Sequence, residues 1–349
     1  MPPTPDALPS PPHYDPSNAE RWWHAANAAQ LYPSAREWAS RHGVAPAAQD
    51  TESTLLLLVD VQRDFCLPEG SLYVGGRSGR GAIEDSRRLA GFIYRNLDRI
   101  TSTVATLDSH LPQQIFFPSF WVDHAGQPAQ AHRVVTVDDV ATGKLVPRPE
   151  LASWVADGDA GWLRDHAEFY CRQLEESGRY ALYLWPPHCL LGSPGHALAG
   201  VVEEARLFHA FCRSAEAAVE VKGAGLLSEH YSVLGPEVLL ARDGGVLGEA
   251  NERLVRRLLE ADRVVVAGQA ASHCVRSTLE DLWVLAEERD PSALERIYVL
   301  ADCMSAVAVR GDAGEWIADF TDEAVAVLER CRGAGMQIVH SDMPMEDWA

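Results

Sequence analysis

Three residues with complementary chemistry, Asp60, Lys222 and Cys274, each come just after an apolar run of this 349-residue chain. A carboxylate, an ammonium and a thiol are groups that could together carry out nucleophilic chemistry. The runs 54–59, 217–221 and 263–268 have the length and composition of buried strands. Because ligands bind beyond the carboxyl ends of the strands in an open α/β sheet, we expect the three side chains to converge on one crevice.

Cys274 stands where a strand passes through a tight turn into a helix. The run 263–268 ends in glycine, and after Cys274 apolar residues recur at spacings of three and four. The first turn of a helix presents unpaired N–H groups and the positive end of the dipole, so it lowers the pKa of a thiol and favours the thiolate. Taken alone, this segment is equally compatible with a buried structural cysteine.

A second group of side chains has the chemistry of metal ligands. Asp108 and His110 follow the run 100–107 and, two residues apart on an extended chain, point the same way. His188 follows two prolines after the run 180–185. One carboxylate and two imidazoles with open coordination positions suit zinc, iron or manganese. The structural alternative is a capping pair and a core histidine.

The segments that carry these residues resemble the cysteine hydrolases of the isochorismatase-like superfamily, and most closely the nicotinamidases. The resemblance extends, with interruptions, from about Thr54 to about His340. Its motifs, in chain order, are LLVDVQRDFC at 57–66, DSH at 108–110, WPPHC at 185–189, GSPG at 192–195, KG at 222–223 and HCV at 273–275.

The resemblance implies a role for each of these residues. Cys274 would be the nucleophile, Asp60 the acid and base, and Lys222 its charged partner. The family has a cis peptide where Gln269–Ala270 stands, and the N–H groups of Ala270 and Cys274 would form an oxyanion hole. The implied metal ligands are Asp108, His110 and His188. The implied substrate-binding residues are Phe65, Trp185 and His273.

With these roles the chain is expected to be a metal-dependent cysteine amidohydrolase. It would cleave a small, nicotinamide-like carboxamide to the acid and ammonia through a thioester. The divalent metal, zinc before iron or manganese, would bind the ring nitrogen of the substrate. The alternatives are a hydrolase of a different, larger amide and a non-catalytic scaffold whose N-terminus and insertion bind a partner.

The sequence departs from the nicotinamidase pattern in three places. Ala271 and Ser272 replace the usual Thr-Asp before His-Cys, and the histidine that commonly follows the Asp-x-His segment is missing. His110 and His188 are also farther apart than usual, because an insertion spans about 118–179. The insertion, with a helix expected over 160–177, is either a surface or oligomer contact or a cap that changes the size of the substrate.

Composition limits the classes of partner. A formal charge of −20 argues against nucleic acid and anionic membranes. The seven cysteines, an odd number without repeated short spacing, indicate free thiols in a reducing compartment. With no long apolar run and no signal-peptide core, we expect the protein to be cytoplasmic. Its expected partner is a small-molecule substrate. Trp22 and Trp23, which could dock on the core or on a neighbouring subunit, favour a homo-oligomer.

The alternation of apolar runs and amphipathic segments predicts a three-layer α/β fold of Rossmann-like type, with a mostly parallel sheet covered on both faces. We divide the chain into a proline-rich arm with short helices over 1–53 and a hydrolase domain over 54–349. The expected strands are 54–60, 100–107, 180–185, 217–221, 263–267, 296–301 and 336–339. The expected helices are 18–30, 34–42, 83–97, 197–212, 251–259, 274–288 and 314–331.

Overall fold

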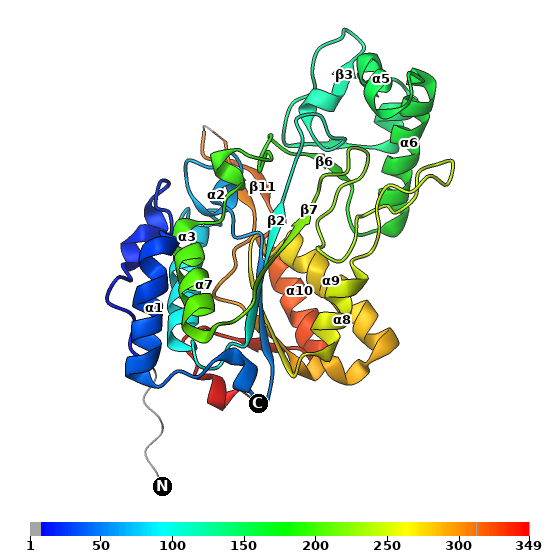
Figure 1. The fold of residues 1–349 in the computed structure, drawn as a ribbon. Coiled ribbons are helices and arrows are strands. Elements are labelled where there is room, and N and C mark those ends of the chain that lie inside the picture. Colours follow the sequence, from blue (N-terminus) through cyan, green and yellow to red (C-terminus); the bar gives the residue numbers. More distant parts are fainter. Residues whose placement is uncertain (1–7, 312, 349) are drawn as a thin grey trace.

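A six-stranded parallel sheet forms the centre of the molecule, in a computed structural model that describes residues 8–311 and 313–348 (Figure 1). The strands lie in the order β12-β9-β8-β1-β2-β7. Their bounds are β1 Thr54–Val59, β2 Ser102–Asp108, β7 Ala217–Lys222, β8 Arg263–Gly268, β9 Ile297–Leu300 and β12 Gln337–Val339. The predicted α/β fold with a parallel sheet is confirmed.

The apolar runs at 54–59 and 263–268 form strands of the sheet that are covered on both faces. Every residue of β1 is buried, and β8 is buried from its second residue onward. A strand buried on both sides needs a continuous apolar run rather than an alternating one. The two strands pair in register from Thr54 opposite Arg263 to Val59 opposite Gly268.

Helices cover the sheet on two sides (Figure 1). One face carries α1 (Ala28–His42), α3 (Gly81–Arg95) and α7 (Gly200–Arg213), and the other carries α8 (Glu252–Glu260), α9 (Cys274–Arg289) and α10 (Thr321–Gly333). A short helix, α2 (Arg63–Cys66), follows β1. The 3-10 turns are Pro16–Glu20, Ala47–Gln49, Pro118–Phe120, Pro149–Leu151, Pro194–His196, Pro291–Arg296 and Met345–Asp347. Within the described residues no helix is long and apolar enough to cross a membrane.

The insertion forms a separate layer above the carboxyl ends of the strands (Figure 1). Within it, β3 (Trp121–Asp123) pairs antiparallel with β5 (Leu145–Pro147), and β4 (Arg133–Val135) pairs antiparallel with β6 (Leu182–Leu184), which follows the insertion. Its helices are α4 (Val137–Ala141), α5 (Ala152–Val155) and α6 (Ala160–Ser177). The helix predicted at 160–177 is therefore present.

Three predicted elements differ from the structure. The run 180–185 was expected in the central sheet, but β6 pairs with β4 of the insertion, because a short apolar run does not specify its partner. The segment 18–30 is not one helix, and a longer helix, α1, begins at Ala28 after the cap of Asn27. The segment 314–331 begins with a hairpin of β10 (Ala308–Arg310) and β11 (Trp316–Asp319), and α10 follows it.

The N-terminal segment packs against the helices of one face. The His13 ring lies 4.8 Å from that of Phe208, and the Tyr14 hydroxyl donates to the Arg87 carbonyl over 3.1 Å. Arg213, which is buried, forms an ion pair with Asp50. The predicted proline-rich arm begins at residues 1–7, which lie outside the described residues.

Candidate active site

Asp60, Lys222 and Cys274 lie together beneath the carboxyl edge of the sheet. The Lys222 ammonium is 2.9 Å from Asp60 Oδ2 and 3.6 Å from Cys274 Sγ. Asp60 is fully buried and Lys222 is 3% exposed. Three residues from separate parts of the chain thus form one buried cluster of a carboxylate, an ammonium and a thiol.

The strand order explains why these residues meet. The chain passes from β1 to β2 and β7 on one side, and from β8 to β9 and β12 on the other. The boundary between β1 and β8 is therefore the point where the strand order reverses, which is where α/β folds bind ligands. Asp60 follows β1, and Cys274 begins the helix after β8.

Asp60 is held in place by its backbone and by a hydroxyl. It leaves β1 with φ at 45°, in the left-handed region that few non-glycine residues adopt. Its N–H donates to Thr106 Oγ1 over 2.9 Å, and the Thr106 hydroxyl donates to Asp60 Oδ1. Thr106 thus orients the carboxylate toward Lys222.

Burial and mutual charge set the protonation of this cluster. Burial raises the pKa of Asp60 and, well above its ordinary value, the pKa of the Cys274 thiol, and Lys222 opposes both shifts. Burial alone would lower the pKa of Lys222, but Asp108, Asp60 and Cys274 raise it well above its ordinary value. The expected lowering of the thiol pKa by the helix is therefore outweighed by burial. In this environment the thiol form of Cys274 is favoured over the thiolate.

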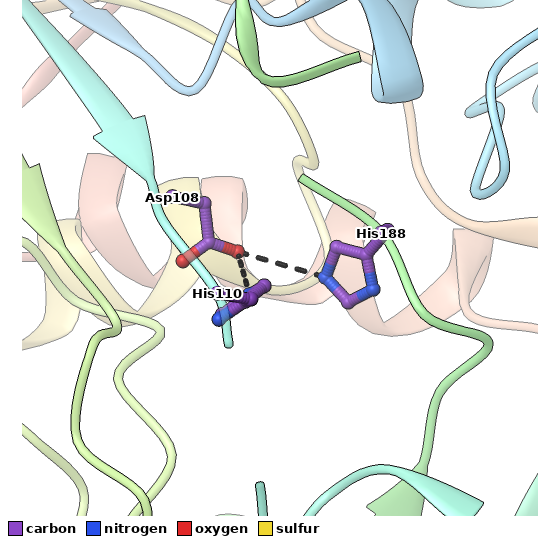
Figure 2. A group of neighbouring side chains, drawn as sticks. All are labelled: Asp108, His110 and His188. Atoms are coloured by element: carbon purple, nitrogen blue, oxygen red, sulfur yellow. Dashed lines mark hydrogen bonds and ion pairs between the residues drawn. The ribbon is translucent and has the colours of Figure 1, made fainter. Parts of the chain in front are cut away.

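Asp108, His110 and His188 form the second group (Figure 2). Asp108 Oδ2 is 2.8 Å from His110 Nε2 and 3.6 Å from His188 Nε2. All three residues are buried, and their ligand atoms lie within 4.8 Å of one another. Asp108 Oδ1 accepts from the Lys222 ammonium over 2.9 Å, so this carboxylate links the two groups.

The donor set fits a divalent metal. Nδ1 of His110 lies 3.1 Å from the Gly223 carbonyl, and Nδ1 of His188 lies 2.8 Å from the Pro186 carbonyl. Because carbonyl oxygens only accept, both contacts accommodate a proton on Nδ1, and in that tautomer each Nε2 would offer a lone pair to a metal. Burial lowers the pKa of His188, so its imidazole is neutral, as ligation requires.

Electrostatics keep Asp108 ionised. Burial alone would raise the pKa of this carboxyl, but His110 and Lys222 hold it well below its ordinary value. Gly223, with φ at 87°, leaves space for the Asp108 carboxylate, because a Cβ at this position would lie 2.7 Å from Asp108 Oδ1. The Gln62 side chain holds the backbone of Asp108, accepting from its N–H over 2.8 Å.

The turn before Cys274 is braced by side chains on both sides. It contains a cis peptide bond between Gln269 and Ala270, where the resemblance implies one. The Gln269 amide donates to Asp85 Oδ2 over 2.9 Å, and Ser272 Oγ accepts from the Val307 N–H over 3.1 Å. As the first residue of α9, Cys274 has no intrahelical partner for its own N–H, which leaves it available to a ligand.

One pocket of about 420 Å³, part of it open to solvent, lies above these groups. Its walls are Phe65, Leu72, Val74, Asp108, His110, Trp185, His188, Glu229, His230, Tyr231, Ala270, His273, Cys274 and Val307. The sequence-predicted residues therefore meet here, except that Asp60 and Lys222 lie behind the wall.

Sequence reasoning missed several residues of the site. Thr106 stands two positions before Asp108 on the same face of β2, so strand alternation could have found it. The segment 229–232 resembles the family's loop at the pocket mouth, but it has no periodicity and its residues were not assigned to the site; Glu229 and Tyr231 line the pocket. The carbonyl of His230 accepts from the Lys222 ammonium over 2.9 Å, and burial lowers the pKa of its ring to about 3.

Comparison with known proteins gives similarity at low identity. No family model matches the chain, and no curated protein matches it. Among solved structures, PnC1 from L. infantum in complex with nicotinate is 20% identical, with a TM-score of 0.42, over 84% of this chain and 94% of that chain. A nicotinamidase/pyrazinamidase from Acinetobacter baumanii is 17% identical, with a TM-score of 0.48, over 84% of this chain and 98% of that chain.

An amidase of a different substrate is similar to the same degree. N-carbamoylsarcosine amidase from Thermoplasma acidophilum is 18% identical, with a TM-score of 0.40, over 84% of this chain and 99% of that chain. Nicotinamidases, pyrazinamidases and an N-carbamoylsarcosine amidase are thus among the solved structures to which this chain is similar.

Proposed function

We propose that this protein is a metal-dependent cysteine amidohydrolase that converts a small, nicotinamide-like carboxamide and water to the carboxylic acid and ammonia. The observation that carries the proposal is the contact of Lys222 with Asp60 and Cys274, beside a pocket that Asp108, His110 and His188 also line. The walls of this pocket enclose little space, which favours a small amide over a larger one.

The first half of the reaction forms a thioester. Asp60 takes the proton of the Cys274 thiol, and the sulfur attacks the carbonyl carbon of the amide. The N–H groups of Ala270 and Cys274 hold the oxyanion, a role typically worth ~3–4 kcal/mol per donor. The C–N bond then breaks, and Asp60 returns its proton to the leaving nitrogen, which departs as ammonia.

The second half releases the acid. Asp60 takes a proton from water, the water oxygen bonds to the thioester carbon, and the C–S bond breaks as the sulfur regains a proton. Lys222 remains protonated throughout, because two carboxylates contact it. Its charge stabilises the ionised form of Asp60 and the thiolate when each appears.

A divalent metal held by Asp108, His110 and His188 would orient a heteroatom of the substrate when bound. Phe65, Trp185 and His273 form the apolar and aromatic walls around the same space. Burial lowers the pKa of His273 to about 3, so this ring is neutral and can pack against an uncharged substrate. These residues position the carboxamide carbon at the sulfur.

The experiment is ammonia release from nicotinamide and pyrazinamide by the native chain and by Cys274→Ala. We expect the variant to lose at least about a thousandfold in kcat/KM while keeping the native circular dichroism spectrum. Cys212→Ala, which removes another buried thiol outside the pocket, is the matched control and keeps full activity. Equal turnover by native protein and Cys274→Ala would refute the proposal.

Metal dependence is tested on the same preparation. Elemental analysis should find one divalent metal per chain, and a chelator should abolish ammonia release until metal is restored. Native protein with bound metal but no turnover of any small carboxamide would instead favour the non-catalytic scaffold.

A further inference from the structure

Trp185 is the large aromatic wall of the pocket, and its orientation is fixed by polar contacts. Its indole Nε1 donates to Glu229 Oε1 over 3.1 Å and to the Tyr231 hydroxyl over 2.9 Å. The ring meets the edge of His273 with centroids 5.0 Å apart. An indole N–H in a buried site needs an acceptor, and the position of that acceptor decides how the ring stands.

Glu229 is a buried carboxyl that the proposed mechanism does not use. It is 4% exposed and lines the pocket. Burial raises the pKa of Glu229 well above its ordinary value. An acid so buried is costly unless it is hydrogen-bonded, and its bond with the indole of Trp185 meets part of that need.

The insertion fixes the backbone of Glu229. The Glu229 N–H donates to the Tyr170 hydroxyl over 2.8 Å, and Tyr170 belongs to α6 and is fully buried. The same helix is tied to the loop at two other points, where Trp162 Nε1 donates to Asp243 Oδ2 over 2.8 Å and His166 Nε2 lies 3.3 Å from the Leu227 carbonyl. Three contacts thus tie the loop over 227–243 to α6.

We propose that Glu229 is a positioning residue for the substrate pocket: it holds the Trp185 indole in place, and Tyr170 of the insertion holds Glu229. This inference rests on the proposed function for its effect on catalysis, although the placement of the indole can be measured without a substrate. The insertion is then an internal support of the pocket wall. Substrate specificity depends on it through a chain of two hydrogen bonds.

Kinetics of two substitutions at one position test the role. Glu229→Gln keeps an oxygen that accepts from the indole, whereas Glu229→Ala removes that oxygen and leaves the Tyr231 hydroxyl as the remaining acceptor. We expect Glu229→Ala to raise KM for nicotinamide about tenfold, equivalent to about 1.4 kcal/mol, with kcat within about threefold of native, because a wall that holds substrate and transition state alike changes binding alone. Glu229→Gln should keep KM within about twofold of native.

Tyr170→Phe tests the support from the insertion and provides a variant if Glu229→Ala does not fold. It removes the acceptor of the Glu229 N–H and keeps the ring. We expect a rise in KM of about threefold, again with little change in kcat. An unchanged KM in Tyr170→Phe would show that the hydrogen bond from the insertion does not affect substrate binding, and it would overturn that part of the proposal.

Indole N–H resonances of the full chain labelled with ¹⁵N-tryptophan give the readout that needs no substrate. The Trp185 signal is assigned by its loss in Trp185→Phe. It should shift and exchange faster with solvent in Glu229→Ala and stay in place in Glu229→Gln. Glu287→Ala is the matched control, because Glu287 accepts from the Trp283 indole over 2.6 Å at the surface; it should move the Trp283 signal alone and leave KM unchanged.

An unmoved Trp185 signal in Glu229→Ala would overturn the positioning role, as would equal KM values for the alanine and glutamine variants. Native protein that hydrolyses no carboxamide would refute the proposed function, and the tryptophan signals would still decide whether Glu229 places the indole.

Discussion

Removing the ammonium of Lys222 should leave a buried charge without its partner. The Lys222 side chain is 1% exposed, and it lies 2.9 Å from Asp60 Oδ2 and 2.9 Å from Asp108 Oδ1. At an effective dielectric constant of about 20, each contact corresponds to about 6 kcal/mol of attraction. The net cost of removing one partner of such a buried pair is smaller, about 3–5 kcal/mol, because desolvation offsets much of the attraction.

We therefore expect Lys222→Met to lower the free energy of unfolding by about 4 kcal/mol at pH 8. Asp108 keeps His110 as a partner in this variant, so Asp60 carries most of the loss. Asp60→Asn removes the uncompensated charge. The double variant Lys222→Met/Asp60→Asn should then lose less than the sum of the single variants, by about 2–3 kcal/mol.

The pH dependence of the single variant follows from the same charge. Burial already raises the pKa of Asp60 in the native protein, and Lys222 opposes that shift, so removing Lys222 raises this pKa further. A carboxyl whose pKa is higher in the folded state loses stability as pH rises from its unfolded value toward its folded one. The deficit of Lys222→Met relative to native protein should therefore be smaller at pH 5.5 than at pH 8.

The assay is urea unfolding followed by circular dichroism, for native protein, the two single variants and the double variant at both pH values. A matched cycle on Arg257 and Glu216, an ion pair at 2.8 Å that is partly exposed, should show a coupling below about 1 kcal/mol. Additivity of the Lys222 and Asp60 changes within about 0.5 kcal/mol would refute the buried pair and, with it, the electrostatic basis of the mechanism.

Two further outcomes follow from other parts of the structure. Burial lowers the pKa of His209 to about 4 from an ordinary value of 6.5, so this neutral ring contributes stability that is full above pH 6.5 and is lost as pH falls toward 4. His209→Gln keeps a donor for the Ile100 carbonyl and should reduce the loss of unfolding free energy between pH 7 and pH 5 by about 2 kcal/mol. An unchanged pH profile of the unfolding free energy would contradict the pKa shift. Gly223→Ala should weaken metal binding by about tenfold or more, measured by competition with a chelator, because its Cβ would press on Asp108 and His110. The control is Gly178→Ala, which is also at positive φ but has open space around it, and which should lose stability and keep its metal affinity. Equal metal affinity in both variants would show that the space at Gly223 does not matter.

The elements that sequence predicted well are those whose pattern has a single explanation. The run 54–59 is apolar at every position, which suits a strand covered on both faces, and it is the central strand β1. Since Asp60, Asp108, Lys222 and Cys274 all stand at or just after strand ends, parallel topology alone brings them to one edge of the sheet.

The parts that sequence could not predict depend on contacts between distant segments. The run 180–185 has the same pattern whether it joins the central sheet or pairs with β4, and only the folded insertion decides between them. Trp316 and Ile317 are apolar but exposed in a hairpin, so the helix predicted over 314–331 begins only at Thr321. Glu229 gains its place from Tyr170 on another element, a relation that no local pattern contains.

All seven sulfhydryl groups are shut away from bulk solvent, and Cys274 is the one that borders the pocket. An electrophile shaped like a small amide would thus reach a single thiol of the folded chain, that of Cys274. The fraction of chains labelled at Cys274, measured by mass spectrometry, would give the fraction of molecules with an intact active site. Labelling at the other six cysteines would give the fraction that is locally or globally unfolded.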